Sequence, residues 1–177
     1  MTEFSRLYRV DALSEEPRAI SVEADPAELG ALAKRFSLPA VDRLRSQASL
    51  VRRGDAVQAS GRLEAEVVQS CVASGEPVPS RVDEAFAIEF RPEPDEPRGD
   101  DEVELSESEL DVVFYKGGSI DFGDAVAETL ALSLDPFPRS PAAEAALREA
   151  GVRSEEDARA ASNPFGALAA LKDKLGK

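Results

Sequence analysis

The chain has 177 residues, 42% of them hydrophobic and 6% aromatic, which fits one domain with a modest core and additional tails. It contains no histidine and one cysteine, which excludes an intramolecular disulfide, zinc sites of the Cys/His type and histidine as a general base. The net charge of −14 comes from residues 61–135, where twenty acidic and five basic side chains give −15.

Two short strands and a helix are predicted for the start of the chain. Alternating apolar residues indicate strands over residues 4–12 and 18–24. Asp25 is followed by a proline at the first helical position and by an acid at the third, which is the order of residues at a helix start. The helix is expected to cover residues 26–36.

Three long strands follow. Residues 44–53 lead into a turn at residues 54–55, after which apolar and polar residues alternate strictly over residues 57–67. The alternation resumes over residues 78–90 after a second turn, and tight turns between successive strands predict an antiparallel meander. Gly61 lies inside the middle strand, where it indicates a bend or a bulge.

The composition changes after this meander. Residues 91–109 are rich in proline and acids and have few apolar side chains, which predicts an acidic disordered loop. A further strand is expected over residues 110–115, followed by a tight hairpin turn at residues 117–118. Asp121 can cap a helix over residues 122–132, and two prolines then end that helix.

The last part of the chain predicts two helical pieces. Ser140 can cap the first, and Asn163 can begin the second, whose apolar stripe fits either core packing or the binding of a partner. The chain is thus expected to form a single α+β domain over residues 1–135 and a helical, partly mobile tail over residues 136–177. The antiparallel sheet of about five to six strands, with peripheral helices, is compatible with an open sheet and with a partial barrel.

The candidate catalytic groups have structural explanations. Asp121 and Asp124 suit the start of a helix, and the acids at positions 100 and 101 suit a solvated run. Cys71 is in phase with the apolar face of its strand, which favours a small buried side chain over a nucleophile. We therefore expect no catalytic residue, no metal, no cofactor and no enzymatic activity.

One part of the chain has a local excess of positive charge. Between positions 34 and 53, six basic side chains are opposed by a single acid, Asp42. These side chains are the candidate contacts for RNA or another anion, and a solvated surface is the alternative. They are Lys34, Arg35, Arg43, Arg45, Arg52 and Arg53.

Three stretches carry a resemblance to a known family. They read GRLEAEVVQSCVASGEPVPSRVDEAFAIEF, IDFGDAVAETLALSLDPFPRSP and NPFGALAALK. In combination they resemble the central strand pair, a later motif and the Asn-Pro-Phe close of the YceD family, the large ribosomal RNA subunit accumulation proteins. The matching positions are Gln69, Cys71, Gly118, Asp121, Leu130, Leu132, Pro136, Pro138, Asn163, Pro164 and Phe165.

The resemblance implies a pathway, the accumulation of large-subunit ribosomal RNA, and supplies no catalytic residues. Many relatives carry a second cysteine shortly after the first and a further pair after the prolines. Residues 72–74 and 139–141 occupy those regions here, and none of them is a cysteine. A metal role proposed for such relatives therefore does not transfer to this chain.

Three functional hypotheses follow. The first is a non-enzymatic ribosome-assembly factor that binds a basic ribosomal protein or a precursor of the large subunit. The second is direct binding of ribosomal RNA through the basic residues of positions 34–53. The third, a carboxylate-dependent ribonuclease, is disfavoured by the absence of histidine and of a recognisable metal-binding acid cluster.

We expect a cytoplasmic protein without a membrane partner. No apolar run approaches the roughly 20 residues that a membrane helix needs. The N-terminal residues also lack the basic-then-apolar pattern of a signal peptide.

Overall fold

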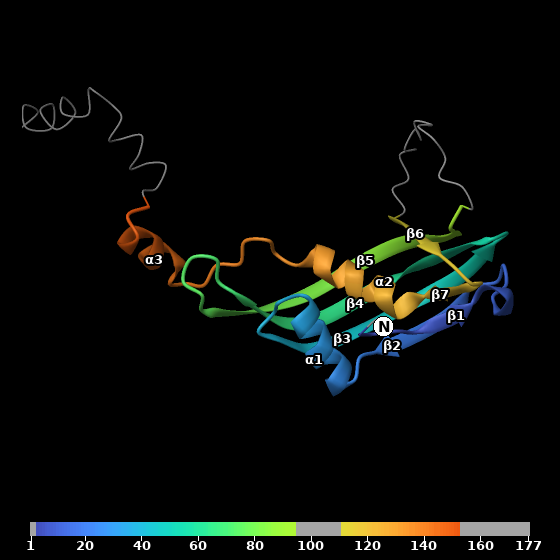
Figure 1. Ribbon diagram of the computed structural model, residues 1–177, viewed down its shortest axis with the longest axis horizontal. Helices are drawn as coiled ribbons and strands as arrows, with labels where there is room; N and C mark the ends of the chain where they lie inside the picture. The colour runs from blue at the N-terminus through green and yellow to red at the C-terminus, as the bar shows by residue number, and fades with distance from the viewer. Residues whose placement is uncertain (1–2, 95–110, 153–177) are drawn as a thin grey trace, which may run out of the picture.

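A computed structural model describes residues 3–94 and 111–152 of the chain (Figure 1). Its elements, in chain order, are β1 (Leu7–Arg9), a 3-10 turn (Val10–Ala12), β2 (Arg18–Glu23), α1 (Pro26–Arg35), β3 (Ala40–Arg53), β4 (Ala56–Ser70), β5 (Pro77–Pro92), β6 (Asp111–Tyr115), β7 (Ser119–Asp121), α2 (Phe122–Ser133) and α3 (Ala143–Glu149). The α+β class expected from the sequence is confirmed.

The strands form two sheets. The larger has the order β2-β3-β4-β5-β6, and β1 pairs antiparallel with β7 in a second, two-stranded sheet. Strands β2 to β5 are the predicted antiparallel meander. The expectation of a purely antiparallel sheet is wrong for β6, which lies parallel to β5. The parallel pairing begins at Ile88 and Asp111, so the connection between these two strands has only to bring the chain back to the last residues of β5.

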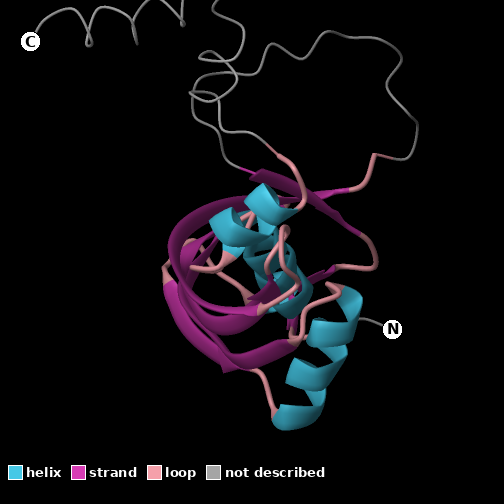
Figure 2. Ribbon diagram, turned by 90° about the vertical axis from the view of Figure 1, so that its left-hand side faces the viewer, coloured by secondary structure: helices cyan, strands magenta, loops and turns pink. Residues whose placement is uncertain are grey.

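The large sheet curves around α2. Figure 2 shows the strands wrapping about this helix, which lies on the concave side. The edge strands β2 and β6 do not pair with each other, so the described strands form no closed barrel. Among the described strands, β2 and β6 are therefore the two edges of the curved sheet.

The core fills the space between α2 and the sheet. Phe122, Val126 and Leu130 recur on one face of α2 and are completely buried, as their spacing predicts. The strict alternation of β4 is also confirmed, because its inward side chains are buried one after another. The buried apolar residues of β4 are Val57, Ala59, Leu63, Ala65 and Val67.

The start of α1 follows the sequence signal closely. The carboxylate of Asp25 accepts from the backbone N–H groups of Ala27 and Glu28, and Glu28 accepts in turn from the backbone of Asp25. Glu28 also binds the guanidinium of Arg6 through both carboxylate oxygens, at 2.7 and 2.9 Å. The capping box therefore also fixes the N-terminal segment beside α1.

Gly61 serves close packing. The pairing of β4 with both neighbours runs without a shift through Gly61, so there is no bulge at this position. A Cβ on Gly61 would lie 2.3 Å from the carbonyl oxygen of Gln47 and 2.6 Å from the Cβ of Ala48. The irregularity in β3 lies between Val41 and Arg43.

Three further expectations need correction. The strand predicted over residues 4–12 is limited to Leu7–Arg9, because its partner β7 has only three residues. The turn at residues 117–118 is present but joins strands of different sheets, so it closes no hairpin. Ser140 does not cap α3, whose N-cap residue is Ala142 and has no side-chain hydrogen bond.

The two segments predicted to be irregular or terminal are only partly described. Strand β5 continues through Arg91 and Pro92, the first two residues of the predicted acidic loop. Residues 95–109 of that loop lie outside the described residues, as does the predicted helix that begins at Asn163.

Candidate functional site

The first two candidate anion contacts lie at the end of α1. Lys34 and Arg35 are in its last turn. Arg35 donates to Asp124 of α2 at 2.7 Å and to Glu3 at 3.2 Å, so its guanidinium links α1, α2 and the N-terminal segment. These carboxylates, Asp124 foremost, raise the pKa of Arg35.

The next two candidates are part of an ion-pair network on the convex, outward face of the sheet. Arg45 of β3 binds Glu64 on the adjacent strand, and Arg43 lies 4.0 Å from Glu23 of β2. The same face also carries two pairs between β4 and β5, which extend the network across four strands. Those pairs are Arg62 with Asp83 and Arg81 with Glu66.

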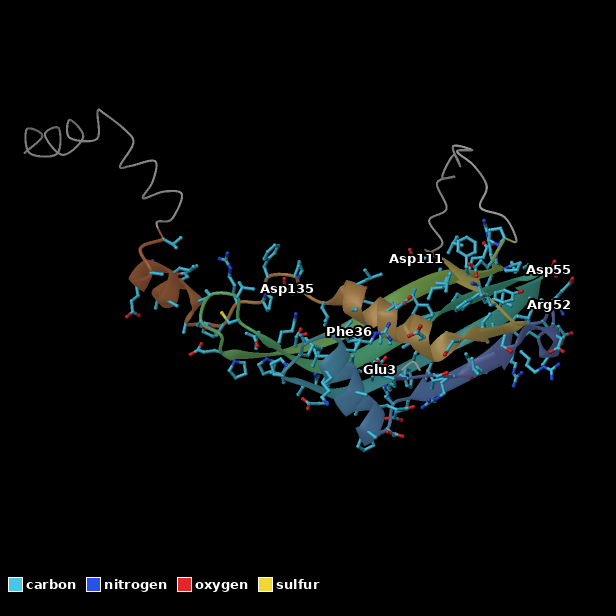
Figure 3. All side chains as sticks on the ribbon, viewed as in Figure 1. Glu3, Phe36, Arg52, Asp55, Asp111 and Asp135 are labelled. Atoms are coloured by element: carbon cyan, nitrogen blue, oxygen red, sulfur yellow. The ribbon has the colours of Figure 1, made fainter. Side chains whose placement is uncertain are left out.

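The last two candidates lie at the far end of β3. Figure 3 shows Arg52 and Asp55 together at one tip of the molecule, whereas Phe36, the C-cap of α1, lies near its middle. Successive strand residues advance by about 3.3 Å, so Arg43 and Arg53 are separated by about 33 Å along β3. The six basic residues therefore form three separate groups.

An open cavity of about 500 Å³ adjoins Arg52. Its lining includes Arg9, Asp11 and the turn at Gly117 and Gly118. Both glycines have positive φ, at 69° and 73°, which brings the backbone of this turn to the cavity wall. Arg9 pairs with Asp11 and lowers the pKa of its carboxyl, while the Nε of Arg52 donates to the carbonyl of Gly54 at 2.7 Å.

Sequence reasoning missed Arg9 and Tyr115 as members of this cavity. The hydroxyl of Tyr115 donates to the backbone carbonyl of Asp55 at 2.6 Å and joins β6 to the turn between β3 and β4. The pairing of β1 with β7 brings Arg9 to the same place. The local signals in the sequence for this site are Arg52 and the double-glycine turn.

The family-motif positions around Cys71 meet at the opposite end of the molecule. The backbone N–H of Val72 donates to the carbonyl of Pro138 at 2.9 Å, and the Nε2 of Gln69 donates to the carbonyl of Asp135 at 2.8 Å. The hairpin tip between β4 and β5 is thus bound to the segment that follows α2. This segment, which the sequence assigned to a separate tail, packs on the domain at its start.

Cys71 is buried in this junction, as its phase in the strand predicts. The hydroxyl of Ser140 donates to Glu76 at 2.6 Å and lies 3.1 Å from the hydroxyl of Ser74. The backbone N–H of Ser74 donates to the sulfur of Cys71 at 3.4 Å. Hydrogen bonding from the backbone of Ser140, and next from the side chain of Ser74, lowers the pKa of the thiol to about 6.

The remaining motif positions have mixed roles. The carboxylate of Asp121 caps α2 by accepting from the backbone N–H of Asp124. It also accepts from the backbone N–H of Arg6 at 2.8 Å and from the hydroxyl of Ser5 at 2.6 Å. Leu130 is buried, whereas Leu132 is 82% exposed. The carbonyl of Gly118 accepts from the backbone N–H of Val10 at 3.0 Å. Pro136 follows the end of α2. The positions Asn163, Pro164 and Phe165 lie outside the described residues.

The described residues contain no group of three or more histidine, cysteine or acidic side chains placed to hold a metal ion. Asp121 and Asp124, the described pair of neighbouring carboxylates, are engaged at the start of α2 and with Arg35. None of the described helices is long and apolar enough to cross a membrane.

A family model described as the large ribosomal RNA subunit accumulation protein YceD matches residues 59–172. The match covers well over half of the chain, from β4 to beyond α3. The chain belongs to the YceD family, whose description assigns it a role in the accumulation of large-subunit ribosomal RNA. No curated protein and no solved structure matches the chain.

Proposed function

We propose that this protein is a non-enzymatic, cytoplasmic assembly factor of the large ribosomal subunit, which acts by binding a basic ribosomal protein or the precursor particle that contains it. The observation that carries this proposal is the pairing of Arg35, Arg43 and Arg45 with carboxylates of the same chain. An arginine held by an internal carboxylate offers little net charge to RNA phosphate.

The remaining charge favours a basic partner. Ion pairs within the chain leave its net charge of −14 unchanged, and this charge produces a negative field that repels RNA and attracts cationic proteins. Electrostatic attraction of this kind accelerates association and keeps a basic ribosomal protein from binding RNA nonspecifically. Family membership supplies the pathway in which such a partner occurs.

The test is a titration of the full chain with individual basic proteins of the large subunit and with naked large-subunit RNA. Binding to one such protein at 50 mM salt, weakened at least tenfold at 300 mM salt, is the expected result because screening shortens the range of the field. Tight binding of naked RNA, with none of the basic proteins bound at low salt, would remove the proposal.

The cavity beside Arg52 favours a second candidate, contact with RNA phosphate. Its lining combines Arg52, whose Nε donates to the carbonyl of Gly54, with exposed backbone of the double-glycine turn. The structure provides a matched test, because Arg43 and Arg45 are ion-paired on the convex face. Replacing Arg52 and Arg53 by glutamine should weaken RNA binding and flatten its salt dependence, while the same change at Arg43 and Arg45 should leave it unaltered.

A further inference from the structure

Strand β6 is an edge strand, and one of its sides has no partner among the described strands. It lies at the end of the strand order and pairs with β5 alone among the described strands (Figure 1). An exposed edge offers backbone N–H and C=O groups to which another chain can add a strand. The two edges of the sheet differ in how they are protected.

The direction of the open backbone groups follows from one hydrogen bond. The carbonyl of Tyr115 accepts from the backbone N–H of Glu93 at 3.0 Å, so the polar groups of Tyr115 face the β5 side. The backbone N–H and C=O groups of successive residues point to alternate sides of a strand, so the groups of Val113 also face β5. The N–H and C=O groups of Val112 and Phe114 consequently point toward the open edge.

The side chains of the same two residues form an apolar pair. Val112 is 42% exposed and Phe114 is 59% exposed. Their register partners on β5, Glu89 and Arg91, are charged and pair with each other at 2.6 Å. The other edge, β2 (Arg18–Glu23), carries charged or polar side chains at most of its exposed positions, a common protection of edges.

Deepening the proposed function on which this inference rests, we propose that the open edge of β6 binds an extended basic segment of the partner protein as an added strand. Residues 95–110, which lead into β6, carry eight acidic side chains and one arginine. Such a sequence attracts a segment rich in lysine and arginine. A second copy of this chain is disfavoured as occupant, because each copy has a net charge of −14.

The probe is a synthetic peptide of about 14 residues that alternates lysine or arginine with valine or isoleucine, a length that exceeds the strand it must cover. Its control has the same charges with prolines in place of every second apolar residue, which prevents strand addition. Binding is measured by fluorescence anisotropy on the full chain at low salt. Hydrogen exchange is followed at the amides of Val112 and Phe114, which should slow at least tenfold when the alternating peptide is bound.

Two substitutions separate the backbone contribution from the side-chain contribution. Phe114→Pro removes an N–H that faces outward, which an edge strand tolerates, and should weaken binding of the peptide at least tenfold. Phe114→Ala keeps the N–H and should weaken binding about threefold to tenfold through the lost apolar contact. Leu132→Ala, which alters an exposed leucine on α2, is the matched control and should leave binding unchanged.

The outcomes are separable. Unchanged binding in Phe114→Pro, or equal binding of the proline-containing peptide, overturns the β6 proposal, even if an intact ribosomal protein still binds and the assembly function stands. Slowed exchange at Val112 and Phe114 caused by RNA or by self-association also overturns it. Slowed exchange with the alternating peptide supports the β6 site, and failure of every ribosomal protein to bind would then remove the assembly function alone.

Discussion

The guanidinium of Arg35 in the last turn of α1 donates to the carboxylate of Asp124 in the first turn of α2 at 2.7 Å. The sequence identifies Arg35 as a candidate RNA contact and Asp124 as one of two neighbouring carboxylates. In the structure they hold the two helices together. Each side chain neutralises the charge of the other. This internal contact is a structural role for both residues.

This contact should contribute modestly to stability. Arg35→Gln should lower the free energy of unfolding by about 1 kcal/mol, because a partly exposed ion pair and its hydrogen bonds are lost. Lys34→Gln, in the same turn of α1, is the control and should change stability by less than about 0.5 kcal/mol. Urea unfolding measures both variants, and equal effects would contradict the internal role of Arg35.

The two leucines of the α2 motif should differ sharply. Leu130→Ala should destabilise the protein by about 2–5 kcal/mol, since the side chain is fully buried against the sheet. Leu132→Ala should stay within about 0.5 kcal/mol, because that side chain is 82% exposed. Thermal and urea unfolding provide the comparison, and a large loss in Leu132→Ala would show that this leucine has a partner in the folded chain.

The glycines make a second matched pair. Gly61→Ala should lower stability by about 1–3 kcal/mol, because the added methyl group collides with the backbone of β3. Gly30→Ala lies inside α1 with open space around it and should raise stability by about 0.5–1 kcal/mol. A neutral Gly61→Ala variant, with unchanged spectra, would contradict the close approach of β3 and β4.

The thiol of Cys71 should make stability depend on pH. Its pKa falls from 9.0 to about 6 in the folded protein, so the folded state favours the thiolate. The resulting stabilisation is fully present above the unfolded pKa and is lost as the pH falls through about 6. The stability difference between the native chain and Cys71→Ala should therefore grow from pH 6 to pH 9. Urea unfolding of both proteins at each pH measures this difference, and a difference that does not change with pH would contradict the prediction.

Local patterns predicted the elements that depend on local chemistry. The capping box of Asp25, the alternation of β4 and the 3.6-residue spacing of Phe122 and Leu130 each act within a few residues. The pairing of β1 with β7 and the parallel placement of β6 depend on contacts between distant segments, which no local pattern encodes.

The candidate site shows the same division. The local excess of positive charge is visible in the sequence, but the carboxylates of Glu23 and Glu64 reach it only through the pairing of neighbouring strands. Arg43 and Arg53 are close in sequence, yet the extended strand separates them by about 33 Å. Proximity in sequence is a poor guide to proximity on a long strand.

The pairing of Leu7 with Asp121 affects how the protein is made. The first strand has no partner until roughly 110 further residues have been synthesised, which takes on the order of 10 s at usual rates of translation. During that interval α2 is also missing, and the concave face of β3, β4 and β5 remains uncovered on the nascent chain. The speed of translation across β6 and α2 thus sets how long this apolar face is available to chaperones or to aggregation.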